Sequence, residues 1–192
     1  MSVSERLKGL RTALAEVDLN ALLVSQPENR RYMSGFTGSS GWLLISAEAA
    51  ILITDFRYTE QATTQSPDYE VRQIAGAMGT WLPDILKGLG AGKRVGFESE
   101  HVTHAAHGRL AKAAGEAGVD LTPTEGLVEK LRVTKDAAER ESLLRAIQLT
   151  DQAFEAVVAS LTPGVSEKEV AWRIERTMRE MGAEAIAFDL IV

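Results

Sequence analysis

Apolar positions in the first 125 residues switch repeatedly between helical and strand-like spacing. Leu7, Leu10 and Leu14 recur every three or four residues, which is the spacing of one face of an α-helix. Short, nearly continuous apolar runs follow, and such runs are typical of buried strands. The patterns predict helices over 2–17, 29–32, 57–64, 80–89 and 103–116, and strands over 21–24, 42–45, 50–54, 69–74, 94–98 and 119–121. We therefore expect an α/β fold with a mixed β-sheet flanked by helices, in which the hairpin over 42–54 supplies the antiparallel part.

The pattern changes in the last third of the chain. One long amphipathic helix is expected over 136–161, and a second helix over 166–181 opens with a capping box formed by Ser166 and Glu169. A final apolar strand is expected over 185–192. The inner face of the long helix is expected to hold Leu143, Ala146, Ile147, Phe154, Val157 and Val158.

Two helices and one strand expose apolar faces that they cannot bury among themselves. We therefore predict a complete domain over residues 1–130 and a second, incomplete one over residues 131–192. The second part either packs back onto the first or has lost most of its sheet.

The amino-acid composition excludes several classes of function. Hydrophobic residues make up 45% and charged residues 25% of the 192 residues, values of a folded globular protein. The formal net charge is −6 and the cations do not cluster, so nucleic acid is not expected as a partner. There is no cysteine, which excludes disulfides and thiolate chemistry and favours a cytoplasmic location. The most apolar stretch, 42–54, is too short to cross a membrane, and the N-terminus lacks the pattern of a secretory signal.

Glycine and histidine motifs offer weak candidate sites. Gly35, Gly38 and Gly41 are spaced as in some phosphate-binding loops, but a strand follows them where a dinucleotide fingerprint needs a helix. We interpret them as a tight turn that needs positive φ. Gly92-Lys93 fails as a phosphate loop for a similar reason. The three histidines, at 101, 104 and 107, are spaced three apart, and we expect a solvated helix N-terminus there in preference to a metal site.

The segment TDFRY gives the strongest candidate site. Asp55, Arg57 and Tyr58 place an anion, a cation and a phenol directly after a strand, where open α/β sheets gather ligands. The alternative is an ion pair that caps the next helix. No Ser-His-Asp arrangement and no G-x-S-x-G elbow is present, so spacing alone yields no catalytic centre.

Four longer segments carry a more specific signal. They read ALLVSQPENRRYMSGFTGSSG at 21–41, ILITDFRYTEQA at 51–62, LRVTKDAAERESLLRAIQLTDQAF at 131–154, and LTPGVSEKEVAWRIERTMREMGAEAIAFDLIV at 161–192. In this order they resemble the creatinase, prolidase and aminopeptidase P family of pita-bread metallohydrolases. The resemblance covers nearly the whole chain and is closest to the Xaa-Pro aminopeptidases and dipeptidases. It implies a creatinase-type N-terminal domain followed by the start of an α+β pita-bread domain.

The resemblance also implies a mechanism and partners. Family members hydrolyse the bond before proline with two divalent ions, usually manganese or cobalt, which activate a bridging water. The ligands are two Asp, one His and two Glu that would follow Val192, and Asp189 is not expected to be one of them. In some dimeric relatives the arginine that Arg57 matches reaches substrate across the subunit interface. We therefore expect Arg57 and Tyr58 to bind substrate, and a homodimer.

The chain as given is therefore expected to lack metal ligands and to be inactive alone. In the parent enzyme, this part would serve dimerisation and shape the substrate site for proline-containing peptides. Two alternatives stay open: a non-catalytic protein- or peptide-binding module of the same architecture, and a creatinase-type amidinohydrolase.

Overall fold

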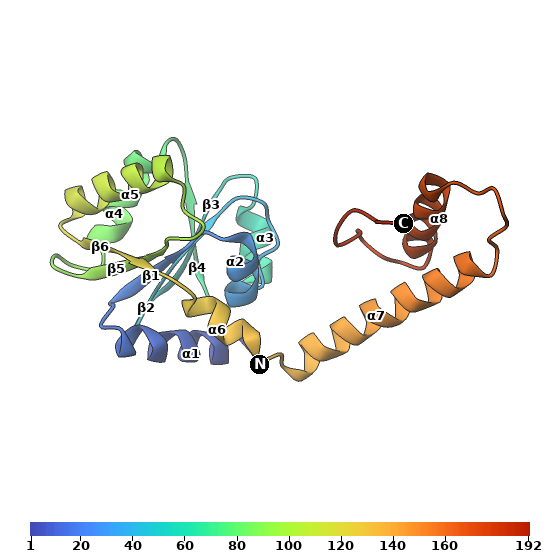
Figure 1. Ribbon diagram of the computed structural model, residues 1–192. Coiled ribbons are helices and arrows are strands. Elements are labelled where there is room, and N and C mark those ends of the chain that lie inside the picture. Colours follow the sequence, from blue (N-terminus) through green and yellow to red (C-terminus); the bar gives the residue numbers. More distant parts are fainter. The chain divides into compact units, whose positions relative to one another are not determined.

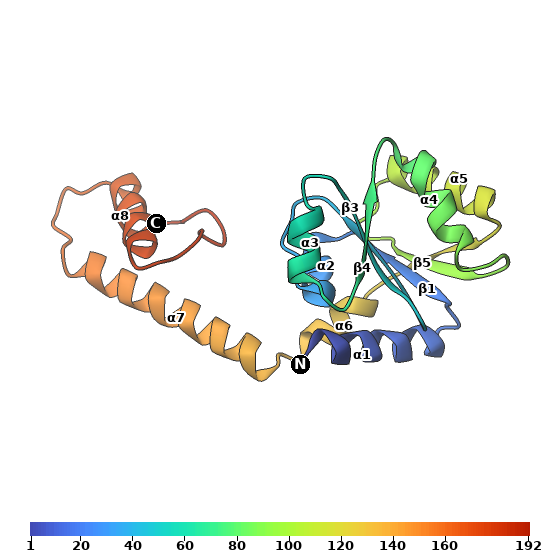
Figure 2. The same ribbon diagram turned by 180° about the vertical axis from the view of Figure 1, so that it is seen from behind.

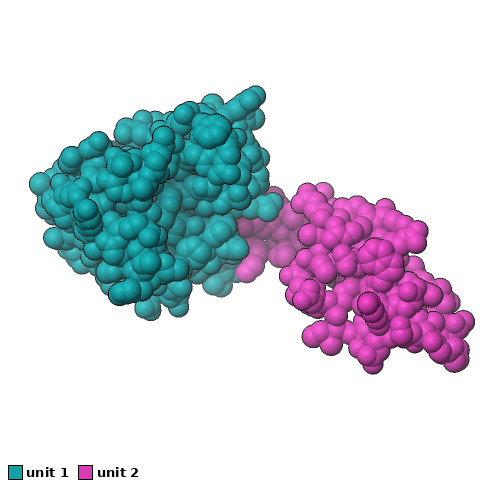
Figure 3. Space-filling model, turned by 90° about the horizontal axis from the view of Figure 1, so that it is seen from above, with its two compact units in different colours: residues 1–134 teal, residues 135–192 magenta.

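The computed structural model describes residues 1–192 and divides them into two units, residues 1–134 and residues 135–192 (Figure 3). The first unit is a layered α/β structure (Figure 1). Its strands are β1 (Ala21–Val24), β2 (Trp42–Ser46), β3 (Ala50–Asp55), β4 (Glu70–Ile74), β5 (Arg94–Glu98) and β6 (Asp120–Thr124). Its helices are α1 (Val3–Glu16), α2 (Pro27–Ser34), α3 (Thr59–Gln65), α4 (Met78–Lys87), α5 (His104–Ala117) and α6 (Leu127–Val133).

The six strands form one mixed sheet in the order β4-β3-β2-β1-β5-β6. Strand β2 is antiparallel to both of its neighbours, and every other pairing is parallel. The carboxyl ends of β1, β3, β4, β5 and β6 therefore meet at one edge of the sheet, together with the start of β2. We call this the carboxyl edge. The predicted mixed α/β sheet, with the hairpin as its antiparallel part, is confirmed.

The two outermost strands of the sheet, β4 and β6, differ in amino-acid composition. Strand β4 carries the charged residues Glu70 and Arg72, which pair with each other at 2.7 Å. Strand β6 contains Pro123. Because the Thr124 carbonyl accepts from Ser99 on the β5 side, the neighbouring Pro123 has its ring nitrogen on the open side, where no ladder hydrogen bond is lost.

Helices cover both faces of the sheet (Figures 1 and 2). Side chains alternate along each strand, so Leu22 faces one cluster of buried residues and Leu23 the other. The cluster around Leu22 includes residues of α1, α2, α3 and α6, and the cluster around Leu23 includes residues of α4 and α5. Each leucine that is fully buried in this way contributes roughly 1.5–3 kcal/mol.

A buried polar cluster ties β5, α2 and α6 together. Glu98, at the end of β5, accepts hydrogen bonds from the backbone N–H groups of Ser25 (2.6 Å) and Gln26 (2.8 Å) and from the Asn29 side-chain amide (2.8 Å). Asn29 is fully buried, and its Oδ1 accepts from Arg132 of α6 at 2.7 Å. The Glu98 carboxylate thus satisfies the N–H groups that precede α2, at the carboxyl edge.

Helix α6 was not expected from the sequence. It has only seven residues, too few for an apolar period to repeat. Leu127 and Val128 are nevertheless buried beside α1, and the Tyr32 hydroxyl of α2 donates to the Leu131 carbonyl at 3.2 Å. Tertiary packing therefore determines this helix.

Several predicted boundaries need correction. Helix α3 begins at Thr59 instead of residue 57, and α2 extends over Pro27–Ser34 instead of 29–32. Helix α4 extends over Met78–Lys87 instead of 80–89, and Pro83 lies in its interior. No helix of the structure has both the length and the apolar content needed to cross a bilayer.

The second unit contains two helices, α7 (Ala137–Val158) and α8 (Glu167–Glu180). The strand predicted over 185–192 is wrong: this segment is irregular, and Ile191 is 96% exposed. A strand needs a neighbour to accept its backbone hydrogen bonds, and these residues have none. The predicted capping box is half formed, because Ser166 accepts from the Glu169 N–H while the Glu169 carboxylate pairs with Arg173.

The predicted inner face of α7 is mostly exposed. Only Ala153 and Val157 of this helix are buried, whereas Ile147 and Phe154 are about half exposed. Helix α8 has no buried residue. The second unit therefore has almost no core of its own.

Removing the buried carboxylate should destabilise the first unit. Glu98→Ala leaves the backbone N–H groups of Ser25 and Gln26 without an acceptor and removes one of the acceptors of the Asn29 amide, at a cost of about 3 kcal/mol in the free energy of unfolding. Urea denaturation measures this loss. The neighbouring exposed Glu100 is the control, because Glu100→Ala should change stability by less than about 0.5 kcal/mol. Equal effects of the two variants would contradict the role assigned to Glu98.

The unequal cores predict unequal resistance to proteolysis. In limited trypsin digestion, we expect the first cuts within residues 135–192, leaving residues 1–134 as a stable fragment. Mass spectrometry of the time course identifies the fragments. Cleavage of both units at the same rate would contradict this expectation.

Candidate functional site

Arg57 lies on the surface just beyond the end of β3 and is held by Asp55. Its Nε and Nη2 atoms donate to the two oxygens of the Asp55 carboxylate, each at 2.8 Å. The backbone N–H of Arg57 donates to the same carboxylate at 3.1 Å. This two-pronged pairing fixes the plane of the guanidinium. The Arg57 side chain is nevertheless 58% exposed. Its remaining nitrogen, Nη1, donates no hydrogen bond to the protein.

The ion pair anticipated as an alternative for TDFRY is thus formed, but it does not cap the next helix. The N-cap residue of α3 is Tyr58, and no side chain caps that helix. Asp55 binds the N–H of Arg57 in the turn before the helix. The pair therefore orients Arg57 and takes no part in capping α3.

Both partners of this pair keep their charge across the physiological range. The hydrogen bonds that Arg57 donates lower the pKa of Asp55 to about 2. The same contacts raise the pKa of Arg57 above its usual value. The site thus presents a permanently charged, oriented guanidinium to solvent.

Tyr58 supports the guanidinium from the side. Its ring centroid lies 5.2 Å from the Arg57 guanidinium carbon, within the range of a cation–π contact. The Tyr58 hydroxyl forms a 2.6 Å hydrogen bond with the Ser39 hydroxyl, and its ring meets Phe36 edge to face at 5.9 Å. Ser39 and Phe36 were not expected to support the site, because they lie about 20 residues away in the sequence.

The glycine-rich turn that carries Ser39 is organised by a buried arginine. Arg30 is 3% exposed, and its Nη2 and Nη1 donate to the carbonyls of Gly38 (2.7 Å) and Gly41 (2.8 Å). Burial lowers the pKa of Arg30, and no carboxylate forms an ion pair with it. The turn therefore directs carbonyl oxygens inward at a cation. A phosphate cradle needs the opposite arrangement, with N–H groups converging.

The glycines of this turn serve two purposes. Gly35 has φ of 79° and ends α2, as the sequence interpretation required. Gly38 does not have positive φ, which corrects that interpretation. A Cβ on Gly38 would lie 2.2 Å from the Phe36 ring, so this glycine is needed for close packing.

The histidines do not converge. His101 precedes α5, Thr103 caps that helix through the Ala106 N–H, and the His107 ring packs against Phe97 at 5.2 Å. Nowhere in the chain do three or more His, Asp or Glu side chains gather in a way that could hold a metal ion. The residues present thus do not supply the two-metal site that the resemblance implies.

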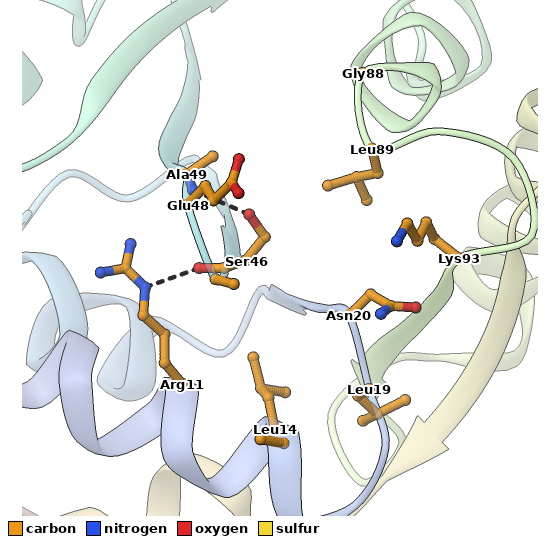
Figure 4. A pocket seen from close by; sticks show the side chains of 12 residues that line it. Arg11, Leu14, Leu19, Asn20, Ser46, Glu48, Ala49, Gly88, Leu89 and Lys93 are labelled. Carbon is orange, nitrogen blue, oxygen red and sulfur yellow. Dashed lines mark hydrogen bonds between the residues drawn. The ribbon is translucent and has the colours of Figure 1, made fainter.

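Pockets lie at both ends of the strands. One pocket of about 350 Å³ lies at the end of the strands opposite to the carboxyl edge, between α1, the β2–β3 turn and the start of β5 (Figure 4). Its Arg11 side chain donates to the Ser46 carbonyl, and its Asn20 accepts from the Arg94 N–H. These polar groups tie strand ends together. At the carboxyl edge, two pockets of about 330 and 260 Å³ share a wall made of Ser40, Gly41 and Trp42, and Asp55 lines the second.

The chain matches two family descriptions in sequence. Residues 6–134 match the creatinase/prolidase N-terminal domain, and residues 141–192 match metallopeptidase family M24. The uncharacterized peptidase YqhT of Bacillus subtilis is 36% identical over 187 residues, covering 97% of this chain and 52% of that protein. The chain thus spans about half the length of this relative.

Solved structures agree with these matches. The Xaa-Pro dipeptidase from Bacillus anthracis superposes with a TM-score of 0.91 at 38% identity, covering 98% of this chain and 52% of that one. The N-terminal domain of the cytoplasmic peptidase PepQ from Mycobacterium tuberculosis is 40% identical, with a TM-score of 0.60. It covers 66% of this chain and 98% of its own length. The chain therefore belongs to the creatinase/prolidase family, through an N-terminal domain followed by a segment of metallopeptidase family M24.

Proposed function

We propose that this chain is the N-terminal portion of an Xaa-Pro peptidase, which hydrolyses the peptide bond before proline with two divalent metal ions. The portion described here shapes the substrate site and contributes to a homodimer. The observation that carries the proposal is the exposed, oriented Arg57 guanidinium at the carboxyl edge, in a chain whose similar solved structures include an Xaa-Pro dipeptidase. Manganese or cobalt as the metal, the homodimer and a cytoplasmic location stay predictions.

In this proposal, Arg57 and Tyr58 bind substrate and take no part in bond cleavage. The Arg57 guanidinium has one nitrogen left to donate to a peptide carbonyl or carboxylate after pairing with Asp55. Tyr58 holds that nitrogen in place through its ring and through its hydrogen bond to Ser39. Prearranged donors of this kind lower the entropic cost of binding a flexible peptide. The metal ligands would belong to the part of the enzyme beyond this chain, so no catalytic step is assigned here.

The pairing that orients Arg57 can be measured directly. Carboxyl-detected NMR titration should give Asp55 a pKa near 2, and Arg57→Ala should return it towards the ordinary value of 3.8. Since the folded-state pKa lies below the unfolded value, the pair stabilises the fold fully above about pH 4. This contribution should be lost as pH falls towards 2. An Asp55 pKa unchanged by Arg57→Ala would contradict the assigned pairing.

Substrate binding by Arg57 predicts a kinetic effect in the full-length enzyme that this proposal assumes. Arg57→Ala should lower kcat/KM for an Xaa-Pro dipeptide by about tenfold to a hundredfold, because a hydrogen bond to a charged group contributes on the order of 1.5–3 kcal/mol. The melting temperature should change little. Steady-state kinetics and thermal denaturation of the same samples provide the comparison.

Arg72 supplies a matched control. It pairs with Glu70 two residues away on β4, also on the surface, so Arg72→Ala removes a similar exposed ion pair from the strand next to β3. That variant should leave kcat/KM unchanged. If Arg57→Ala lowers the melting temperature by several degrees and leaves kcat/KM intact, Arg57 has a structural role and the substrate-binding assignment is wrong.

A further inference from the structure

The pocket at the end of the strands opposite to the carboxyl edge has no part in the proposed function. It lies between α1, the β2–β3 turn and the start of β5, and it measures about 350 Å³ (Figure 4). Pockets for small-molecule ligands measure roughly 300–1,000 Å³, so this one has room for a small molecule. We call it the α1–β5 pocket.

Apolar side chains line much of the α1–β5 pocket. Leu14 of α1 and Leu19 are buried, and Leu89, just after α4, is half-buried. Figure 4 shows Leu14 and Leu89 on opposite sides of the opening. An apolar group that entered between them would be removed from water on both sides, which is favourable.

One side of the pocket carries two unused hydrogen-bond donors. The Asn20 N–H donates to the Arg94 carbonyl at 2.9 Å, and Asn20 Oδ1 accepts from the Arg94 N–H at 2.8 Å. These two contacts orient the Asn20 amide and leave its Nδ2 without an acceptor in the protein. The Lys93 amine beside it forms no hydrogen bond or ion pair either. Two donors on one side, one of them charged, suit a carboxylate.

The other side of the pocket carries an unpaired carboxylate. Ser46 and Glu48 of the β2–β3 turn lie across the opening from Lys93 (Figure 4). The Ser46 carbonyl accepts from Arg11 at 2.8 Å, and its hydroxyl accepts from the Ala49 N–H at 3.0 Å, so this turn is held in place. The Glu48 carboxylate pairs with no cation of the protein. It is therefore available to an ammonium group.

Three kinds of surface thus meet in one pocket: a donor pair, a carboxylate and an apolar lining. A metal ion would find only one carboxylate there. A hydrocarbon would cover Asn20 Nδ2 without giving it an acceptor, which is costly. A simple anion would leave Glu48 unpaired. A ligand that carries an anion, a cation and an apolar group satisfies all three surfaces.

We propose that the α1–β5 pocket binds a free α-amino acid with an apolar side chain. Its carboxylate accepts from Asn20 Nδ2 and the Lys93 amine, and its ammonium group faces Glu48. The side chain of the amino acid lies between Leu14 and Leu89. This inference goes beyond the proposed function and does not depend on it, because Arg57 lies at the other end of the strands.

Leucine and three compounds that each lack one of its groups provide the test. L-leucine, added to the 192-residue protein, should shift the side-chain amide signals of Asn20 and the backbone signal of Leu89 in a ¹H–¹⁵N NMR spectrum, in a saturable manner. The signals of α8 in the second unit should not move. Isocaproate lacks the ammonium group, isoamylamine lacks the carboxylate, and glycine lacks the side chain. Each should bind at least about fivefold more weakly than leucine.

Variants assign each charge of the ligand to a residue. Lys93→Gln and Glu48→Gln should each weaken leucine binding at least about threefold, because one charged partner is lost. Both side chains are exposed, so neither change should affect folding, which circular dichroism verifies. Lys112→Gln is the control: this exposed lysine of α5 lies outside the pocket, and its variant should bind leucine as the parent does.

The same variants predict a change of preference. In Glu48→Gln, leucine should lose its advantage over isocaproate, because the partner of the ammonium group is gone. In Lys93→Gln, leucine should lose part of its advantage over isoamylamine and keep its advantage over isocaproate. A general loss of pocket structure would lower the binding of all compounds together and would not reorder them.

Four results would overturn the inference. They are no saturable shift of the Asn20 signals up to the solubility of leucine, isocaproate or isoamylamine binding as tightly as leucine, glycine binding as tightly as leucine, and equal effects of Lys93→Gln and Lys112→Gln. None of these results bears on Arg57. The proposed function is tested separately, by the kinetics of Arg57→Ala, so the failure of one is distinguishable from the failure of the other.

Discussion

The candidate site depends on a single buried cation, Arg30. Its guanidinium is removed from water and forms no ion pair with a carboxylate, which is costly unless its donors are satisfied. The carbonyls of Gly38 and Gly41 satisfy two of them and thereby fix the turn between α2 and β2. That turn presents Ser39 to Tyr58, and Tyr58 lies against Arg57. The exposed guanidinium is thus positioned by a buried one through two intervening contacts.

The direction of the strands explains why these contacts and the pockets gather together. All strands except β2 end at the carboxyl edge, so the loops after β1 and β3 meet there. Strand β2 runs the other way and begins at the same edge, which brings Trp42 and the glycine-rich turn next to Asp55. One reversed strand therefore supplies both the shared wall of the two pockets at this edge and the support of Arg57. The hydrogen bonds that Glu98 accepts from Ser25 and Gln26 lie at the same edge, on the side of β5.

Local sequence patterns were sufficient to predict the elements whose structure depends mainly on neighbouring residues. Strands β1, β2 and β3 are nearly continuous apolar runs, and the segment TDFRY begins at the end of β3, so Asp55, Arg57 and Tyr58 could be expected at a strand end. The contact between Tyr58 and Ser39 could not, because it joins residues that only the three-dimensional turn brings together. Helix α6 is too short to leave a periodic pattern, and it forms because α1 and α2 offer it a surface. The segment over 185–192 has a strand-like composition, but pairing requires a neighbour that composition does not supply.

The proline in β6 has a consequence for how the sheet can grow. An edge strand with free backbone groups is a template on which another chain can add a strand, and this is a common start of aggregation. Pro123 offers no N–H on that open side, and the charged side chains of β4 oppose the same event at the other end. Both outermost strands of the six-stranded sheet therefore disfavour the addition of a further strand. Assembly of this domain through its helices, its loops or the carboxyl edge is favoured over pairing of its outermost strands.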